Sequence, residues 1–179
     1  MNFLPNVTIV CIDCYNYGKA VLALQKCKEQ VQAAKTILLT DIDIQIDGIE
    51  TILIPSIKSK EDYSNFCIKE LYKYIGTSHC LVVQWDGYIL NGESWDEKFL
   101  DYDYIGAPWL YTDGRNVGNG GFSLRSKKLL SALYGDDLIL STHPEDDCIA
   151  RTYQSYLELE YDIKFAPESV AESFAYELR

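Results

Sequence analysis

Asp86 stands at a point in the chain where a carboxylate could do chemistry. It follows the apolar run Cys80–Val83 and precedes Gly87. An apolar run of this length, bounded by a turn signal, is typical of a buried strand in an α/β sheet, and ligands of such sheets bind at the carboxyl ends of the strands. Asp86 is therefore placed to hold a metal ion or a sugar hydroxyl. A turn-forming aspartate before glycine is the alternative.

Gln84 and Asp86 have the spacing of an Asp-x-Asp pair, with glutamine in the first place. Such a pair holds a divalent cation across two phosphates, because the charge of a leaving pyrophosphate must be neutralised. Two literal copies of the pattern, Asp41–Asp43 and Asp101–Asp103, are each better explained as solvated turns. The position at a strand end favours Asp86.

Two further groups of residues could contribute to a site. In the glycine-rich string Gly118–Ser126, small residues let a substrate approach the backbone, and Arg125 could meet a carboxylate or phosphate. Glu145–Asp147 stands at a helix start, where a rigid carboxylate could take a proton from a hydroxyl. When each string is considered alone, a structural role explains it at least as well. The first string can be a glycine turn before a strand, and the second can be simple N-terminal capping of a helix.

The elements that position these residues follow from the hydrophobic periodicity. Strands are predicted at Val7–Ile12, Lys35–Thr40, Ile49–Ile54 and Cys80–Val83, with helices over Ala20–Val31 and from Ser59 to Gly76. This β-α-β-β-α-β order favours a mostly parallel sheet covered by helices. The second half is predicted to contain short helices at Ser94–Leu100 and Lys127–Tyr134, a helix over Cys148–Leu159, and strands at Tyr104–Ala107, Phe122–Leu124 and Ile163–Ala166.

Composition favours one buried core and a cytoplasmic protein. The chain has 179 residues, 47% of them hydrophobic, with no leader pattern and no run approaching the roughly 20 apolar residues of a membrane span. A net charge of -11 argues against nucleic acid and anionic membranes as partners. The six cysteines are expected to be reduced, and Cys11 and Cys14 are not expected to bind zinc, because residues three apart on a strand face opposite sides.

Taken together and in order, the strings resemble those of GT-A nucleotide-sugar-dependent glycosyltransferases. The similarity is greatest to a glycosyltransferase-like family marked by the strings Q-W-D-G, G-A-P-W, V-G-N-G-G-F-S-L-R and E-D-D. These stand here at Gln84–Gly87, Gly106–Trp109, Val117–Arg125 and Glu145–Asp147. The similarity follows the element order over about Val7–Ala166, and the specific strings all lie at or beyond Gln84.

The resemblance implies a single GT-A-like, Rossmann-like α/β domain over residues 1–179, with a nucleotide-binding half of about 1–90 and an acceptor and catalytic half of about 91–179. It implies that Asp86 binds Mn²⁺ or Mg²⁺, and that Asp146 is the general base of an inverting transfer, with Asp147 as the alternative. The residues implied to contact the nucleotide are Cys11, Asp13, Tyr15, Asp41, Gln84 and Asp86. Those implied to contact the donor sugar or acceptor are Trp109, Gly120, Gly121 and Arg125.

We therefore predict a hexosyltransferase-like enzyme that moves a sugar from a nucleoside diphosphate sugar to a glycan or other hydroxyl acceptor. The chain departs from the family in having one metal carboxylate and no histidine after His143, where many relatives add a C-terminal histidine ligand. A retaining reaction, which needs no base at Asp146, stays open.

Two other functions are compatible with the sequence. One is a non-catalytic nucleotide-sugar or glycan-binding module with the same fold. The other, less favoured, is a sugar-nucleotide-forming nucleotidyltransferase, whose triphosphate usually needs a basic, glycine-rich loop after the first strand. The segment Asp13–Lys19 offers one lysine and one glycine.

Overall fold

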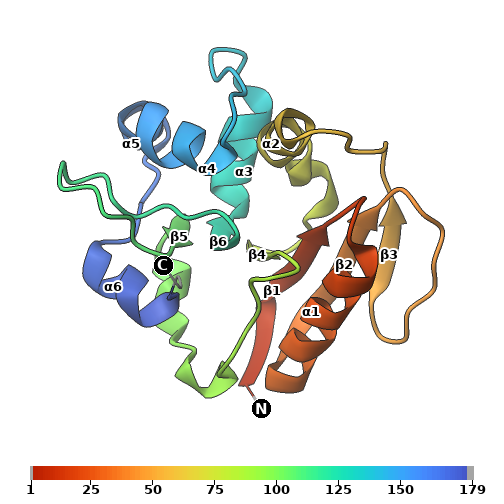
Figure 1. Cartoon of the computed structure of the whole chain (residues 1–179). Helices are drawn as coiled ribbons and strands as arrows, with labels where there is room; N and C mark the ends of the chain where they lie inside the picture. Colours follow the sequence, from red (N-terminus) through yellow and green to blue (C-terminus); the bar gives the residue numbers. More distant parts are fainter. Residues whose placement is uncertain (1, 177–179) are drawn as a thin grey trace.

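Six strands form one sheet in the computed structural model, which describes residues 2–176 (Figure 1). The strand order is β3-β2-β1-β4-β6-β5. The pairs β1–β2, β2–β3 and β1–β4 are parallel, whereas β6 runs antiparallel to both β4 and β5. The predicted mostly parallel α/β sheet is therefore confirmed.

The first half of the chain has the predicted β-α-β-β-α-β order. Its elements are β1 (Asn2–Ile12), α1 (Tyr17–Gln30), β2 (Val31–Thr40), β3 (Glu50–Leu53), α2 (Lys60–Lys69), a 3₁₀ helix (Leu71–Tyr74) and β4 (His79–Val83). The second half contains 3₁₀ helices at Gly92–Ser94 and Glu97–Asp101, β5 (Tyr104–Gly106), β6 (Phe122–Ser126), α3 (Lys127–Gly135), α4 (Glu145–Asp147), a π-helical turn (Cys148–Thr152), α5 (Gln154–Tyr161) and α6 (Glu168–Phe174).

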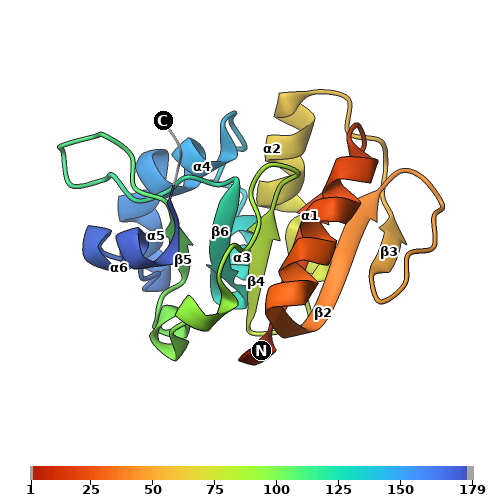
Figure 2. The same cartoon turned by 60° about the horizontal axis from the view of Figure 1, so that its bottom comes forward.

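Helices cover both faces of the sheet, which explains why the second half of β1 and all of β4 are buried. Successive side chains of a strand point to opposite faces. Ile9 and Cys11 accordingly join the core beneath α1 and α6, while Val10 and Ile12 join the core beneath α2 and α3. A third cluster packs α3 and α5 against β5. Figure 2 shows α1 lying along β1 and β2, and α6 beside β5.

The topology gathers several chain segments at one edge of the sheet. The carboxyl ends of β1 and β4 are neighbours, with Cys11 opposite Val83. Because β6 is antiparallel to β4, its first residue, Phe122, also lies opposite Val83. The turn after β4 and the glycine-rich segment before β6 therefore meet at this edge, although more than thirty residues of chain separate them.

Three predicted elements of the second half differ in the structure. Ile163–Ala166 is not a strand, since only Phe165 forms a bridge, to Tyr104. The helix predicted at Ser94–Leu100 is divided into two 3₁₀ turns, because the side chain of Asp96 accepts a hydrogen bond from Lys98 N and starts a new turn. The helix predicted from Cys148 begins at Glu145 and is interrupted by the π-helical turn. Helix α6 was not predicted.

One buried ion pair links β6 to α4. Arg125 is fully buried, and its Nη2 donates to Oε1 of Glu145 at 3.1 Å and to the Gly120 carbonyl at 3.5 Å. Its Nε donates to Ser123 Oγ at 3.0 Å. Removing one partner of such a pair leaves an uncompensated charge in a medium of low dielectric constant. The pair therefore ties the start of β6 to the start of α4.

Each of the six cysteines is a free thiol, and five of them are buried. Burial raises the pKa of Cys27 to about 11. No helix within residues 2–176 is long and apolar enough to cross a membrane.

Leu124, at the centre of β6, tests the core. Its side chain is fully buried, so Leu124→Ala is expected to lower the free energy of unfolding by about 2–5 kcal/mol through lost burial and a residual cavity. The control is Leu159→Ala on the exposed face of α5, at 81% exposure, which is expected to change it by less than about 0.5 kcal/mol. Urea denaturation measures both, and equal effects would contradict this core.

Arg125→Met tests the buried ion pair. Because Glu145 is left buried and unpaired, we expect a loss of about 3–5 kcal/mol in the free energy of unfolding, measured in urea. Adding Glu145→Met should recover part of that loss. Lys35→Met, which breaks the exposed pair between Lys35 and Glu50, should cost less than about 1 kcal/mol. If Arg125→Met lowers the free energy of unfolding by no more than Lys35→Met does, the proposed link between β6 and α4 is refuted.

Candidate functional site

A cleft of about 930 Å³ opens at the edge of the sheet where these segments meet. Its walls come from the segment after β4, the glycine-rich turn before β6, the start of α4 and the end of α6. The polar and backbone groups that line it include Gln84, Asp86, Asn91, Asn119, Gly121, Glu145, Asp146 and Glu172. Four of these are acidic, and no lysine or arginine of residues 2–176 lines the cleft. An anionic ligand here needs a cation to accompany it.

The strand-end turn that carries Asp86 is closed by its own backbone. Gln84 N donates to the Gly87 carbonyl at 3.2 Å, and Gly87 N donates to the Gln84 carbonyl at 3.1 Å. The Gln84 amide nitrogen donates to the hydroxyl of Tyr63, a partly buried residue of α2, at 3.0 Å. Burial raises the pKa of Tyr63, which keeps the phenol protonated. Asp86 itself is exposed and faces the cleft.

The glycine-rich turn packs directly against both the β4 end and α4. A Cβ atom on Gly121 would lie 3.0 Å from Gln84 Oε1, and one on Gly120 would lie 2.5 Å from Glu145 Oε1. Larger residues at these positions would separate the three segments. Gly121 N donates to Asn119 Oδ1 at 3.1 Å, which fixes the turn.

Asp146 connects the cleft to that turn. Its Oδ2 accepts a hydrogen bond from Gly120 N at 2.9 Å, and its Oδ1 accepts one from Asp147 N at 2.9 Å. A carboxylate has about four lone-pair sites, so each oxygen can accept a further hydrogen bond from a bound hydroxyl. Asp147 is not a lining residue, and its carboxylate lies 3.5 Å from Arg151 Nε. The geometry directs Asp146, rather than Asp147, toward the cleft.

Of the residues expected to contact the nucleotide, Gln84 and Asp86 line the cleft, whereas Cys11, Asp13, Tyr15 and Asp41 do not. Asp13 Oδ1 accepts hydrogen bonds from the backbone N–H groups of Tyr15 and Asn16, and so shapes the turn into α1. The Tyr15 hydroxyl donates to the Lys58 carbonyl at 2.6 Å. Cys11 is buried; burial raises the pKa of its thiol, and the charges of Asp13 and Asp86 raise it further. Both carboxylates are therefore near the end of β1.

Of the remaining predicted residues, Asp41 follows β2 and lies near Cys14. Burial is the main cause of the raised pKa of the Cys14 thiol, and the charge of Asp41 raises it further. Trp109 packs in the third core cluster and stacks edge-on with Tyr111, with ring centroids 5.8 Å apart. Arg125 lies behind the glycine turn, where it pairs with the chain's own Glu145. Neither Trp109 nor Arg125 lines the cleft.

Three features of the site were missed by the sequence reasoning. Tyr63 orients Gln84, and the only signal was a tyrosine within an otherwise apolar helical stripe. Glu145 holds Arg125, which nothing in the sequence indicates because twenty residues separate them. Lys19 places its ammonium 4.5 Å from the ring centre of Trp85, next to Asp86 in the chain.

The donor set around Asp86 limits what metal could bind. Within residues 2–176 there is no cluster of three or more histidine, cysteine, aspartate or glutamate side chains able to hold an ion. Mg²⁺, however, is commonly held by one or two carboxylates together with substrate phosphates and waters. Asp86 fits an ion that arrives with a diphosphate and does not fit an ion bound by the protein alone.

Solved structures with a similar fold include glycosyltransferases. A mannosyltransferase, PcManGT from Pyrobaculum calidifontis, in complex with GDP-Man and Mn²⁺, superposes with a TM-score of 0.57 at 10% identity over 92% of this chain. The glycosyltransferase GlyE of Streptococcus pneumoniae gives 0.50 at 18% identity over 89%. This chain spans 56% of the mannosyltransferase and 44% of GlyE.

A third similar structure is a sugar-nucleotide enzyme. It is a CMP:2-keto-3-deoxy-manno-octonic acid synthetase complexed with CTP, with a TM-score of 0.55 at 9% identity, and the match covers 89% of this chain and 88% of the synthetase. At these identities the likeness establishes the fold alone.

The sequence comparisons define the family. No curated protein sequence matches the chain significantly. Residues 47–179 match the model of one family, from the loop before β3 through α6 and the end of the chain. Since that match covers most of the 179 residues, the chain belongs to the family described as "Protein of unknown function (DUF5672)".

Proposed function

We propose that this protein is a glycosyltransferase that moves a sugar from a nucleoside diphosphate sugar to a hydroxyl acceptor. The observation that carries the proposal is that Gln84, Asp86, Gly121 and Asp146 line one cleft at the carboxyl edge of the sheet. Its volume of about 930 Å³ lies within the range of small-molecule sites, about 300–1,000 Å³. The fold likeness to two glycosyltransferases supports the same reaction class.

Asp146 is the proposed general base. Its hydrogen bonds from the Gly120 and Asp147 N–H groups hold the carboxylate in one orientation across the turn from Gln84. An acceptor hydroxyl bound there gives its proton to the carboxylate as the oxygen attacks the sugar carbon, and the nucleoside diphosphate leaves from the opposite side. This direct displacement inverts the anomeric configuration.

A divalent ion, Mn²⁺ or Mg²⁺, is proposed to accompany the donor, with Asp86 as its protein ligand. When bound, it would neutralise the charge of the diphosphate leaving group. The acidic lining of the cleft supports this requirement, since Asp86, Asp146 and Glu172 would otherwise repel the diphosphate, whereas the charge of Glu145 is compensated by Arg125. The remaining proposed nucleotide contacts are the segment Cys11–Tyr15 and Asp41, which lie at the carboxyl ends of β1 and β2.

Nucleotidyl transfer is the second candidate, because the match to the CMP-sugar synthetase runs over nearly the full length of both chains. The charge distribution disfavours it. A nucleoside triphosphate brings more negative charge than a diphosphate sugar, and the cleft has no basic lining residue within residues 2–176. A third possibility, a non-catalytic binding module, differs from both enzymes in that it would bind the donor without turning it over.

Asp146→Asn tests the catalytic proposal. The amide cannot accept the proton, so transfer is expected to fall by about 10²–10⁴-fold, while binding of the donor is retained. Product release from UDP-, GDP- and TDP-sugars with Mn²⁺ measures transfer, and calorimetry measures binding.

Asp137→Asn, on an exposed residue beyond α3, is the matched control and should have no effect. Full activity of Asp146→Asn would refute the base assignment, and selective loss in Asp147→Asn would transfer the role to that residue. No binding or turnover of any of these sugars by the unaltered protein would refute the function itself.

Metal dependence gives a second test. With one carboxylate in the donor set, Mn²⁺ alone should not stabilise the protein measurably. With the donor at about 100 times its Kd, Mn²⁺ and donor together should add about 2.7 kcal/mol of stability. Thermal unfolding measures both, and Asp86→Asn should abolish the Mn²⁺-dependent part only. Equal stabilisation by the donor with and without Mn²⁺ would contradict a metal at Asp86.

A further inference from the structure

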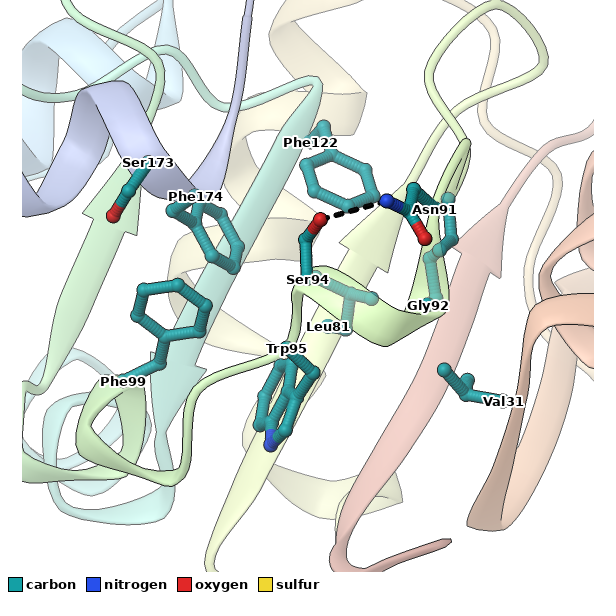
Figure 3. A pocket seen from close by; sticks show the side chains of 11 residues that line it. Val31, Leu81, Asn91, Gly92, Ser94, Trp95, Phe99, Phe122, Ser173 and Phe174 are labelled. Carbon is teal, nitrogen blue, oxygen red and sulfur yellow. Dashed lines mark hydrogen bonds between the residues drawn. The ribbon is translucent and has the colours of Figure 1, made fainter. Parts of the chain in front are cut away.

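A small pocket adjoins the cleft on the α1 and α6 face of the sheet (Figure 3). We call it the aromatic pocket, because the rings of Trp95, Phe99, Phe122 and Phe174 form its walls, with Val31 and Leu81 completing them. The rings pack in sequence. Centroid distances are 5.5 Å from Trp95 to Phe99, 5.2 Å from Phe99 to Phe174 and 5.3 Å from Phe174 to Phe122.

The pocket and the cleft share part of their lining. Phe122 and Phe174 line both, as do Ile89, Asn91, Ser94 and Ser173. Phe122 follows directly after Gly121, the glycine that packs against Gln84. A sugar ring in the cleft can therefore direct a substituent into the pocket while its other atoms stay near the glycine turn.

The size of the pocket limits what can enter. Its volume is about 50 Å³. A water-sized group occupies about 10–15 Å³ by this measure, so about four non-hydrogen atoms fit. A whole sugar ring or a long acyl chain is too large, whereas a small apolar group fits between the rings.

Two exposed polar side chains, Asn91 and Ser94, line the pocket beside the rings. The Asn91 Nδ2 group donates to Ser94 Oγ at 2.8 Å, as the dashed line in Figure 3 shows. An amide nitrogen carries two hydrogens and a serine hydroxyl carries one. Neither the second Asn91 hydrogen nor the Ser94 hydrogen has an acceptor within the described part of the chain. Asn91 and Ser94 can thus donate to one carbonyl oxygen.

We propose that the aromatic pocket binds the acetamido group of a sugar substrate. The methyl group fits between the rings, and the carbonyl oxygen accepts hydrogen bonds from Asn91 and Ser94. The inference rests on the proposed function, because the sugar reaches the pocket through the donor and acceptor cleft. A hydroxyl in the same position would leave the apolar pocket unfilled, so the pocket selects N-acetyl sugars over their hydroxyl counterparts.

Saturation-transfer NMR on the whole protein with Mn²⁺ tests the proposal. The probes are UDP-N-acetylglucosamine, UDP-glucose, and the methyl β-glycosides of N-acetylglucosamine and glucose. We expect the acetyl methyl protons to receive more saturation than the ring protons. If the acetyl methyl group is strongly saturated only in UDP-N-acetylglucosamine, the donor is the sugar that carries the acetamido group. If it is strongly saturated in the methyl glycoside of N-acetylglucosamine, the acceptor carries that group.

Two variants make the test specific to the pocket. Ser94→Leu fills the pocket and should abolish the methyl signal, while leaving the uridine signals unchanged. Ser94→Ala keeps the space and loses one donor, so binding should weaken about two- to tenfold. Ser131→Leu, on the exposed face of α3, is the matched control and should leave all signals unchanged.

The outcomes separate this inference from the proposed function. Saturated uridine protons without preferential methyl saturation in either acetylated probe would refute the acetamido site and leave the nucleotide site standing. Methyl saturation from the glycoside, with no uridine signal in either nucleotide sugar, would support the pocket and count against a uridine-nucleotide donor. No methyl saturation from any probe, or a methyl signal that persists in Ser94→Leu, would overturn the proposal.

Discussion

The buried ion pair between Arg125 and Glu145 is the interaction on which the site depends. Arg125 lies on β6, Glu145 begins α4, and the same guanidinium contacts the carbonyl of Gly120. One side chain therefore connects the sheet, the glycine turn and the helix start that presents Asp146. Removing two charges from water carries a large desolvation cost, so the surrounding polar contacts are needed to retain the pair. Arg125 also lies over the Tyr104 ring, 5.5 Å from its centre.

Charge is the second constraint on the site. The chain carries 27 acidic and 16 basic residues, and the imbalance extends into the cleft, whose charged lining residues are all acidic within the described chain. Two cations near this edge contact other groups. Arg151 pairs with Asp113 and Asp147, and Lys19 lies over Trp85. Under the proposed function, a phosphorylated donor would be attracted mainly by the ion that it brings with it, and its binding would depend on the supply of divalent cations.

The sequence was most informative where local pattern and burial agree. The strands β1, β2 and β4 each contain a buried, mostly apolar run, and the β-α-β-β-α-β order of elements along the chain was predicted correctly. It was least informative where tertiary contacts override a pattern. Ile163–Ala166 has the composition of a strand, but its N–H and C=O groups bond to Asp103 and Tyr104 at isolated points and do not form a ladder.

The candidate site shows the same division. Gln84, Asp86 and Gly121 could be placed at the sheet edge because strand ends and turns are readable in the chain. The burial of Arg125 could not, because an arginine in a short apolar strand is far more often exposed. Nor could the contact of Tyr63 with Gln84, which joins α2 to the turn after β4 across a separation of 21 residues.

Helix α6 has a consequence for how the site behaves over time. It is seven residues long, only Ala171 among them is buried, and its end supplies one wall of the cleft and of the aromatic pocket. Elements with few buried contacts open at a lower free energy than central strands. The wall formed by Phe174 can therefore detach and return while β4 and β6 stay folded, so amide hydrogens in α6 should exchange with solvent sooner than those of the sheet.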